Sequence, residues 1–161
     1  MSALNLFKLR RSVRSFISKP IPASIWADIL EAGRIAATSR SKQARRFVTI
    51  SEPALIAETV REAKMQDFLV NCSALVVGCA TDVQSTGADV IISMTQMETV
   101  AVEKGLGTLW LGVFDRDVIS QRINLPEGHK VVLMMAFGYA AEEGRQALKL
   151  PTEEIFRENS F

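Results

Sequence analysis

The segment 89–114 constrains the fold of this chain more than any other, because it combines a long apolar helix pattern, a glycine break and a short strand pattern. Asp89 is suited to capping the start of the helix, since its short side chain accepts hydrogen bonds from free backbone N–H groups. Apolar residues then surround most of the helix: Val90, Ile91, Ile92, Met94, Met97, Val100, Ala101 and Val102. A helix with so wide an apolar arc is buried on several sides. We therefore expect it to pack against its own sheet and against a second subunit.

A Gly-Leu-Gly break separates this helix from a strand expected over 108–113. Lys104 lies where a positive charge favours the negative end of a helix, and Gly105 suits a left-handed turn after it. The dinucleotide-binding fingerprint needs the order strand, glycines, helix. The order here is helix, glycines, strand, so this is not a Rossmann phosphate loop.

The composition predicts one soluble globular domain over residues 1–161. Hydrophobic residues make up 48% and charged residues 23%, which is unlike a disordered chain. The net charge of +1 gives no overall basic field, so we expect no nucleic-acid partner. No segment reaches the ~20 apolar residues of a membrane span, and early basic residues interrupt any signal-peptide pattern. We expect a cytoplasmic protein with no membrane contact.

The sequence does not indicate a metal site. Cys72 and Cys79 lie in or beside an expected strand, at a spacing that fits neither a metal site nor a disulfide framework. Buried reduced thiols are the expected state. His129 is the single histidine and lies in a turn beside Gly128. We expect its side chain to be solvated and not catalytic.

An arginine-rich motif, RRSVRSF, occupies residues 10–16. If the chain is extended from Ser12, then Val13 points to the opposite side from Ser12 and Arg14. Guanidinium donors with a hydroxyl among them suit a phosphate, because forked charge-assisted hydrogen bonds meet its oxygens. Two alternatives remain at this point. The motif could be a solvated basic face, or a recognition site for a kinase or an anionic surface.

A second polar segment, TSRSKQARR, spans residues 38–46. It is rich in hydroxyl groups and positive charges. Loops of this kind commonly carry binding groups on a rigid scaffold. A plain surface connection fits the composition equally well.

The rest of the chain alternates helices and strands. Helices are expected over 3–9, 23–37, 53–64 and 115–123, and strands over 47–50, 74–80 and 131–138, with a short terminal helix after Pro151. Alternating elements on one core predict a layered helix–sheet–helix architecture.

Taken together and in this order, RRSVRSF, the helix over 23–37, GLGTLWLGVF and LPEGHKVVLMMAFGYAAEEG resemble the nitroreductase family of flavoproteins. The chain is similar to a short member of it. The resemblance implies an α+β fold with three helix–sheet–helix layers and a mainly antiparallel central sheet. It also implies an intertwined homodimer with two FMN sites at the subunit interface.

The resemblance also assigns site residues. It implies flavin and phosphate contacts at Arg10, Arg11, Ser12, Arg14 and Lys149, backbone facing flavin N5 at Leu111, Gly112 and Val113, and contacts with the flavin of the other subunit at Thr38, Ser39 and Ser41. The loop departs from the family pattern Pro-Ser-x-x-Asn-x-Gln-Pro-Trp. Only Gln43 and the hydroxyl of Thr38 match it plainly, and Ala44 and Arg45 replace the Pro-Trp pair. This change predicts a more open and more positive substrate site.

The implied function is an FMN-dependent oxidoreductase that passes hydride from NADH or NADPH through the flavin to a nitroaromatic, a quinone or a similar small aromatic acceptor. The cofactor carries this chemistry, so no side chain is expected to be catalytic. The altered loop favours an alternative: a flavin-binding or flavin-free protein of the same fold without significant turnover. A basic-patch adaptor that uses residues 10–16 is a third hypothesis.

Overall fold

The structure is a computed structural model that describes residues 2–160, with only the backbone of Ser85. The strands are β1 (Phe16–Ile17), β2 (Arg45–Ile50), β3 (Ala74–Ala80), β4 (Gly107–Leu111) and β5 (Lys130–Ala140). The helices are α1 (Ala3–Leu9), α2 (Ala23–Arg34), α3 (Pro53–Glu62), α4 (Val83–Glu103), α5 (Arg116–Arg122) and α6 (Thr152–Ile155), with 3-10 helices η1 (Ser39–Ser41) and η2 (Asp67–Asn71).

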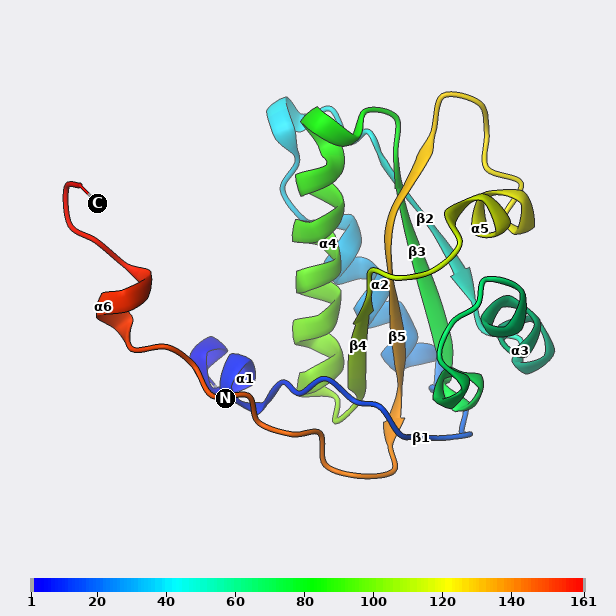
Figure 1. Cartoon of the computed structure of the whole chain (residues 1–161), viewed down its shortest axis with the longest axis horizontal. Coiled ribbons are helices and arrows are strands. Elements are labelled where there is room, and N and C mark those ends of the chain that lie inside the picture. The colour runs from blue at the N-terminus through cyan, green and yellow to red at the C-terminus, as the bar shows by residue number, and fades with distance from the viewer. Residues whose placement is uncertain (1, 161) are drawn as a thin grey trace.

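All the paired strands run antiparallel, with the long strand β5 in the middle of the sheet (Figure 1). One edge of β5 pairs with β3, which in turn pairs with β2. The other edge pairs first with β4 and then, near its end, with β1. The expected mainly antiparallel sheet is confirmed.

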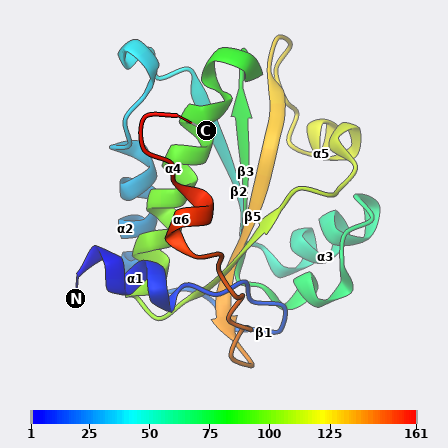
Figure 2. The same ribbon diagram turned by 60° about the vertical axis from the view of Figure 1, so that its left-hand side comes forward.

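Helices cover both faces of the sheet. α2 and α4 lie on one face, and α3 and α5 lie on the other (Figures 1 and 2). Each face has its own apolar core, and α4 supplies Val90, Met94, Met97 and Ala101 to one of them. A small residue brings α2 and α4 close within their layer, since a Cβ on Gly33 would lie 1.9 Å from Cε of Met97. The three expected layers are therefore present, and the methionines of α4 belong to the core within one chain.

The start of α4 differs from the expectation. The helix begins at Val83, so Asp89 lies in its second turn and does not cap it. The capping carboxylate is that of Asp82, whose Oδ1 accepts the N–H of Gln84 at 3.0 Å. The apolar pattern could not locate this end, because the first turn of the helix, which includes Gln84 and Thr86, is mostly polar. The other end agrees with the expectation, since Gly105 has a left-handed backbone with φ +76°.

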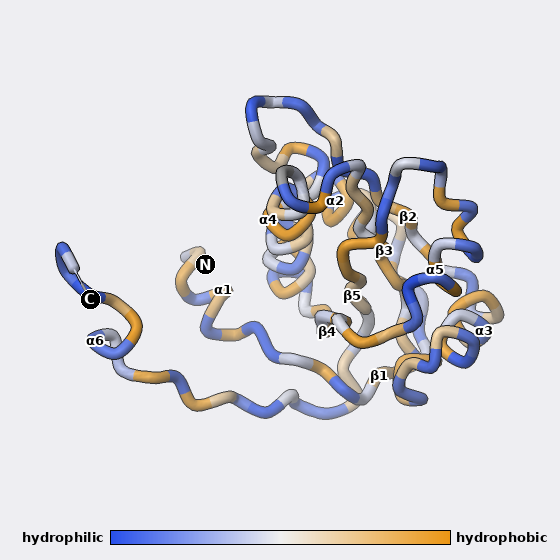
Figure 3. The backbone as a smooth tube through the Cα atoms, turned by 45° about the horizontal axis from the view of Figure 1, so that its top comes forward, coloured by the Kyte–Doolittle hydropathy of each residue, from blue (hydrophilic) through white to orange (hydrophobic). Residues whose placement is uncertain are grey.

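The segment after β5 leaves the body of the protein and carries α6 at some distance from it (Figures 1 and 3). Apolar and polar stretches alternate along it (Figure 3). Leu148 is 101% exposed, and Leu150, Ile155 and Phe156 are exposed as well. Among the described helices, none has the length and apolar character required to cross a membrane.

Candidate functional site

The arginine motif is attached to the sheet through β4. The backbone N–H of Val13 donates to the carbonyl oxygen of Thr108 at 3.0 Å, and Ser12 forms a parallel bridge with Thr108. The side chain of Val13 is buried at 3% exposure. As expected for an extended segment, this leaves Arg14 on the exposed side.

Glu98 of α4 holds the start of β4 in turn. Its Oε1 accepts a hydrogen bond from the hydroxyl of Thr108 at 2.7 Å, and both side chains are buried. A buried carboxylate that accepts a hydrogen bond is far less costly than an unpaired one. The pair therefore connects α4, β4 and residues 12–13. Our sequence reasoning missed Glu98, although a charged residue on a predominantly apolar helix is a usable signal.

A basic groove with a volume of about 250 Å³ lies between α1, the arginine motif and the segment after β5. Its lining residues are Phe7, Lys8, Arg10, Arg11, Ser12, Arg145, Gln146, Ala147 and Lys149. The lining that the structure describes thus holds five cationic side chains and no acidic one. Nη1 of Arg10 donates to Oγ of Ser12 at 3.2 Å. This donor set suits a phosphate group.

The groove unites four of the expected site residues, Arg10, Arg11, Ser12 and Lys149. It also contains Arg145, which our sequence reasoning did not single out. The close approach of the two segments requires a glycine, because a Cβ on Gly144 would lie 2.7 Å from Cβ of Arg11.

A second groove, with a volume of about 190 Å³, contains the other expected flavin-site residues near the arginine motif, Arg14 and residues 111–113. It is lined by Arg14, Gln66, Phe68, Leu109, Trp110, Leu111, Gly112 and Val113. β4 ends at Leu111, so Gly112 and Val113 follow the paired strand, and no atom approaches within 4 Å of a Cβ built on Gly112. An open backbone therefore lies beside an arginine.

The loop residues Thr38, Ser39 and Ser41 are not brought to either groove. Ser39 contacts Asp89 near the start of α4, whereas Arg10 shares a pocket with Glu98 and Val102 towards its end. Because a helix rises 1.5 Å per residue, Asp89 and Val102 are roughly 20 Å apart. The loop and α1 lie towards opposite ends of α4 (Figure 1).

Comparison with known proteins identifies the family. A family model described as "Putative TM nitroreductase" matches residues 3–160. This chain belongs to the nitroreductase family. An "NADPH-dependent oxidoreductase" of Staphylococcus aureus (strain USA300) is 28% identical over 184 residues, which cover 98% of this chain and 73% of the relative.

Solved structures share the fold. A nitroreductase family protein of Clostridium difficile 630 gives a TM-score of 0.89 at 21% identity and covers 100% of both chains. NADPH:FMN oxidoreductase of Vibrio harveyi, complexed with NAD+, gives a TM-score of 0.91 at 21% identity over 99% of this chain and 77% of its own. The chain is accordingly a nitroreductase-type oxidoreductase.

In this nitroreductase the loop over 38–46 has fewer surface cations than its sequence indicates. Arg45 is buried at 7% exposure, and burial lowers the pKa of its guanidinium, partly opposed by the charge of Asp89. Arg46 is exposed and donates to the carbonyl oxygen of Gln43 at 2.8 Å. Arg40 and Lys42 are exposed. Within residues 2–160, no cluster of His, Cys, Asp and Glu side chains is arranged to hold a metal ion.

Proposed function

We propose that this protein is an FMN-dependent oxidoreductase that uses NADH or NADPH to reduce a nitroaromatic, a quinone or a similar small aromatic acceptor. The observation that carries the proposal is the basic groove around Arg10, Arg11 and Lys149, because the same segment, residues 10–14, also contributes Arg14 to the groove with the open backbone at Gly112. A groove suited to phosphate beside an open stretch of backbone is the pairing that a flavin mononucleotide requires.

The residues have separate tasks in this proposal. Arg10, Arg11, Ser12 and Lys149 bind the single terminal phosphate through charge-assisted hydrogen bonds. Arg14 places a positive charge beside the ring system, where it stabilises negative charge as it develops. The backbone over 111–113 would face the edge of the flavin at which hydride is transferred. Bound FMN supplies hydride transfer between the nicotinamide donor and the acceptor, which no side chain of the site could supply.

The proposal includes a homodimer. Large apolar side chains are exposed on α1 (Phe7), on α4 (Ile91 and Ile92) and on the terminal segment (Leu150 and Phe156). Exposed apolar surface of this kind supports association with a second copy, since contiguous apolar patches mark interaction sites. The loop over 38–44 is distant from the grooves of its own chain. Arg40, Ser41 and Lys42 are exposed on it and would be available to the grooves of a second copy, so that each copy completes the other.

NADPH is the donor we favour, because the Staphylococcus aureus relative is named NADPH-dependent and because the loop exposes Arg40 and Lys42. A cytoplasmic location stays a prediction.

One absorbance experiment tests the proposal. The purified protein is reconstituted with FMN, freed of unbound flavin and scanned without oxygen before and after NADPH is added. We expect a flavin spectrum that bleaches with NADPH and returns with a quinone. A retained flavin that NADPH cannot bleach would favour the alternative, a flavin-binding protein without turnover. No retained flavin would refute the proposal.

A further inference from the structure

Asp89 is a buried carboxylate that fixes a loop fifty positions away in the sequence. Its Oδ1 accepts two hydrogen bonds from Ser39, one from the backbone N–H and one from Oγ, both at 3.0 Å. The side chain of Asp89 is 1% exposed. Ser39 is the first residue of η1, so this carboxylate holds the start of the loop against α4.

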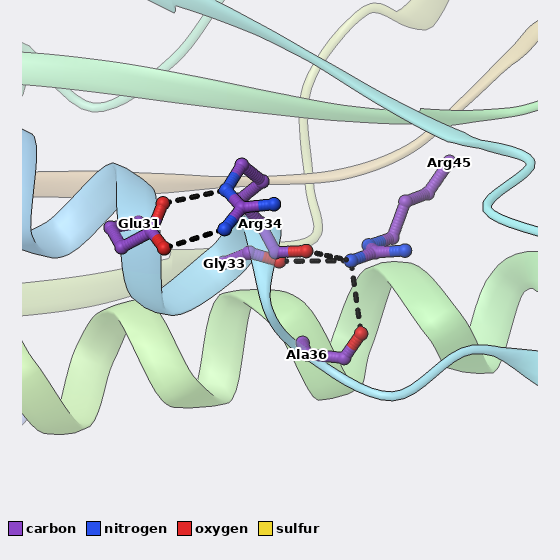
Figure 4. A network of polar contacts seen from close by, with 5 residues as sticks. All are labelled: Glu31, Gly33, Arg34, Ala36 and Arg45. Carbon is purple, nitrogen blue, oxygen red and sulfur yellow. Dashed lines mark hydrogen bonds and ion pairs between the residues drawn. The ribbon is translucent and has the colours of Figure 1, made fainter. Parts of the chain in front are cut away.

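Arg45 fixes the other end of the same loop. Its Nη2 donates to the carbonyl oxygens of Gly33 at 3.0 Å, Arg34 at 2.9 Å and Ala36 at 3.1 Å (Figure 4). These carbonyls belong to the last turn of α2 and the residues after it, where a positive charge is favoured by the helix dipole. Arg45 therefore joins the end of α2 to the start of β2, and residues 37–44 form the connection between two fixed points.

The backbone of the connection is strained. Arg40, Ser41 and Gln43 have φ values of 52°, 56° and 50°, in the left-handed region that non-glycine residues rarely adopt. Each such residue is strained and persists where its surroundings determine its conformation. The hydrogen bonds described within the loop join residues close in sequence, such as that from the N–H of Gln43 to Oγ1 of Thr38 at 3.3 Å. The conformation depends on what holds the two ends.

The two fixed ends also depend on each other electrostatically. Asp89 and Arg45 are both buried, and the charge of Asp89 favours the charged form of Arg45. Removing one member of a buried pair leaves an uncompensated charge, which is strongly unfavourable. The opposite charges of Asp89 and Arg45 thus couple α4 to the end of α2 and the start of β2.

We propose that Asp89, acting through Ser39, and Arg45 are positioning residues that set the conformation of residues 37–44 for contact with the flavin of a second copy. The loop geometry follows from the contacts above, and its contact with flavin rests on the proposed function. In this chain, the contacts of Asp89 and Arg45 hold the loop in which Ala44 and Arg45 replace the proline and tryptophan of the family pattern.

The first test is limited trypsin digestion of the flavin-free protein under native conditions, because Arg40 and Lys42 are trypsin sites within the loop. We expect Asp89→Asn to speed cleavage at these two sites roughly tenfold, as loss of a charge-assisted hydrogen bond predicts. Cleavage at Arg157, in the exposed terminal segment, is the internal reference. Unchanged cleavage in this variant would overturn the proposal.

The matched control is Asp28→Asn, the same chemical change at a carboxylate that pairs with Lys104 at 2.7 Å on the exposed side of α2. Trypsin should cleave the loop of this variant at the wild-type rate. If Asp89→Asn fails to fold, as judged by circular dichroism, Ser39→Ala tests the same contact while keeping the buried charge. It removes the Oγ donor alone, so about threefold faster cleavage is expected. An unchanged rate would refute the role of Ser39.

A double-mutant cycle tests the coupling. Arg45→Met alone should also loosen the loop and speed its cleavage. Arg45→Met combined with Asp89→Asn removes both charges, so its cleavage rate should rise by less than the product of the two single effects. Strict additivity would show that the two residues act independently.

The last measurement separates this proposal from the proposed function. FMN is titrated into the same variants and its affinity compared. Weaker binding in Asp89→Asn and Ser39→Ala, with wild-type affinity in Asp28→Asn, is expected. If the wild type binds no FMN, the proposed function fails while the digestion still decides the loop. If FMN binds all variants equally, the positioning role is refuted.

Discussion

Val13 occupies the space in which a side chain of residue 107 would begin, since a Cβ on Gly107 would lie 2.5 Å from Cγ2 of Val13. The same residue, Val13, donates its N–H to the next residue of the strand, Thr108. The arginine motif therefore lies directly against the start of β4. This contact fixes where the basic groove opens relative to the backbone at Gly112.

The first prediction concerns this contact. Gly107→Ala should displace Val13, cost about 1–3 kcal/mol of stability through overpacking and weaken FMN binding, because residues 10–14 shift. Thermal unfolding and FMN titration measure the two effects. The control is Gly87→Ala in α4, where the nearest atom to the new Cβ is 3.4 Å away, so stability should rise slightly. Unchanged stability and FMN affinity in Gly107→Ala would contradict the prediction.

The second prediction concerns Arg14. Arg14→Ala should weaken FMN binding by at most a few kcal/mol through a lost charge-assisted interaction. Arg61→Ala removes an exposed arginine of α3 and should leave FMN affinity unchanged. Fluorescence titration of flavin-free protein measures both. Equal affinity in Arg14→Ala and wild type would remove Arg14 from the site.

The third prediction concerns the subunit interface. Ile91 of α4 and Leu55 of α3 have nearly equal exposed fractions, 45% and 46%. Ile91→Glu should shift the protein towards monomer, because burying an unpaired carboxylate at an interface is unfavourable, whereas Leu55→Glu should not. Light scattering at micromolar concentration measures the state. A monomeric wild type would refute the homodimer.

The fourth prediction concerns the cysteines. Burial raises the pKa of the Cys72 thiol to about 12 and that of Cys79 to about 11, from 9.0. Since the thiolate is the reactive form, both should react with a disulfide reagent at pH 8 about 100-fold more slowly in the native than in the unfolded protein. Raised folded pKa values give stability that is present below pH 9.0 and is lost as the pH rises towards 11–12. Fast labelling of native protein would show that the thiols are accessible.

Much of the fold could be predicted because local patterns decide it. β3 matches the expected range 74–80, since a short continuous apolar run that includes β-branched valines is typical of a buried strand. The short helix after 115 also agrees, because the carboxylate of Asp115 accepts the N–H groups of Asp117 and Val118 as a helix cap. β1 was missed, because a strand of two residues carries no periodicity.

The site was harder to predict because its contacts join distant residues. A motif can indicate that Arg10 and Ser12 suit phosphate, but the approach of Arg145 depends on how the segment after β5 returns past α1. The predicted role of Asp89 as a helix cap was wrong for the same reason. A short acid before an apolar run indicates a helix cap, while its partner, Ser39, is far away in the sequence.

The last prediction concerns the donor. Arg40 and Lys42 are exposed on the loop, and the described residues over 37–44 include no acid to offset them. Positive charge raises the local concentration of anions, so a second copy's site should favour NADPH, with its additional phosphate, over NADH. Exposed charges are screened over about 10 Å at 0.1 M salt. The preference should therefore decrease with salt, and Arg40→Ala combined with Lys42→Ala should abolish it, mainly through KM.

Lys64→Ala combined with Arg61→Ala, beside α3, is the control with the same loss of charge. Steady-state kinetics with both donors at low and high salt measure the effect. Equal use of NADH and NADPH, insensitive to salt and to the loop substitutions, would assign Arg40 and Lys42 to ordinary solvated surface.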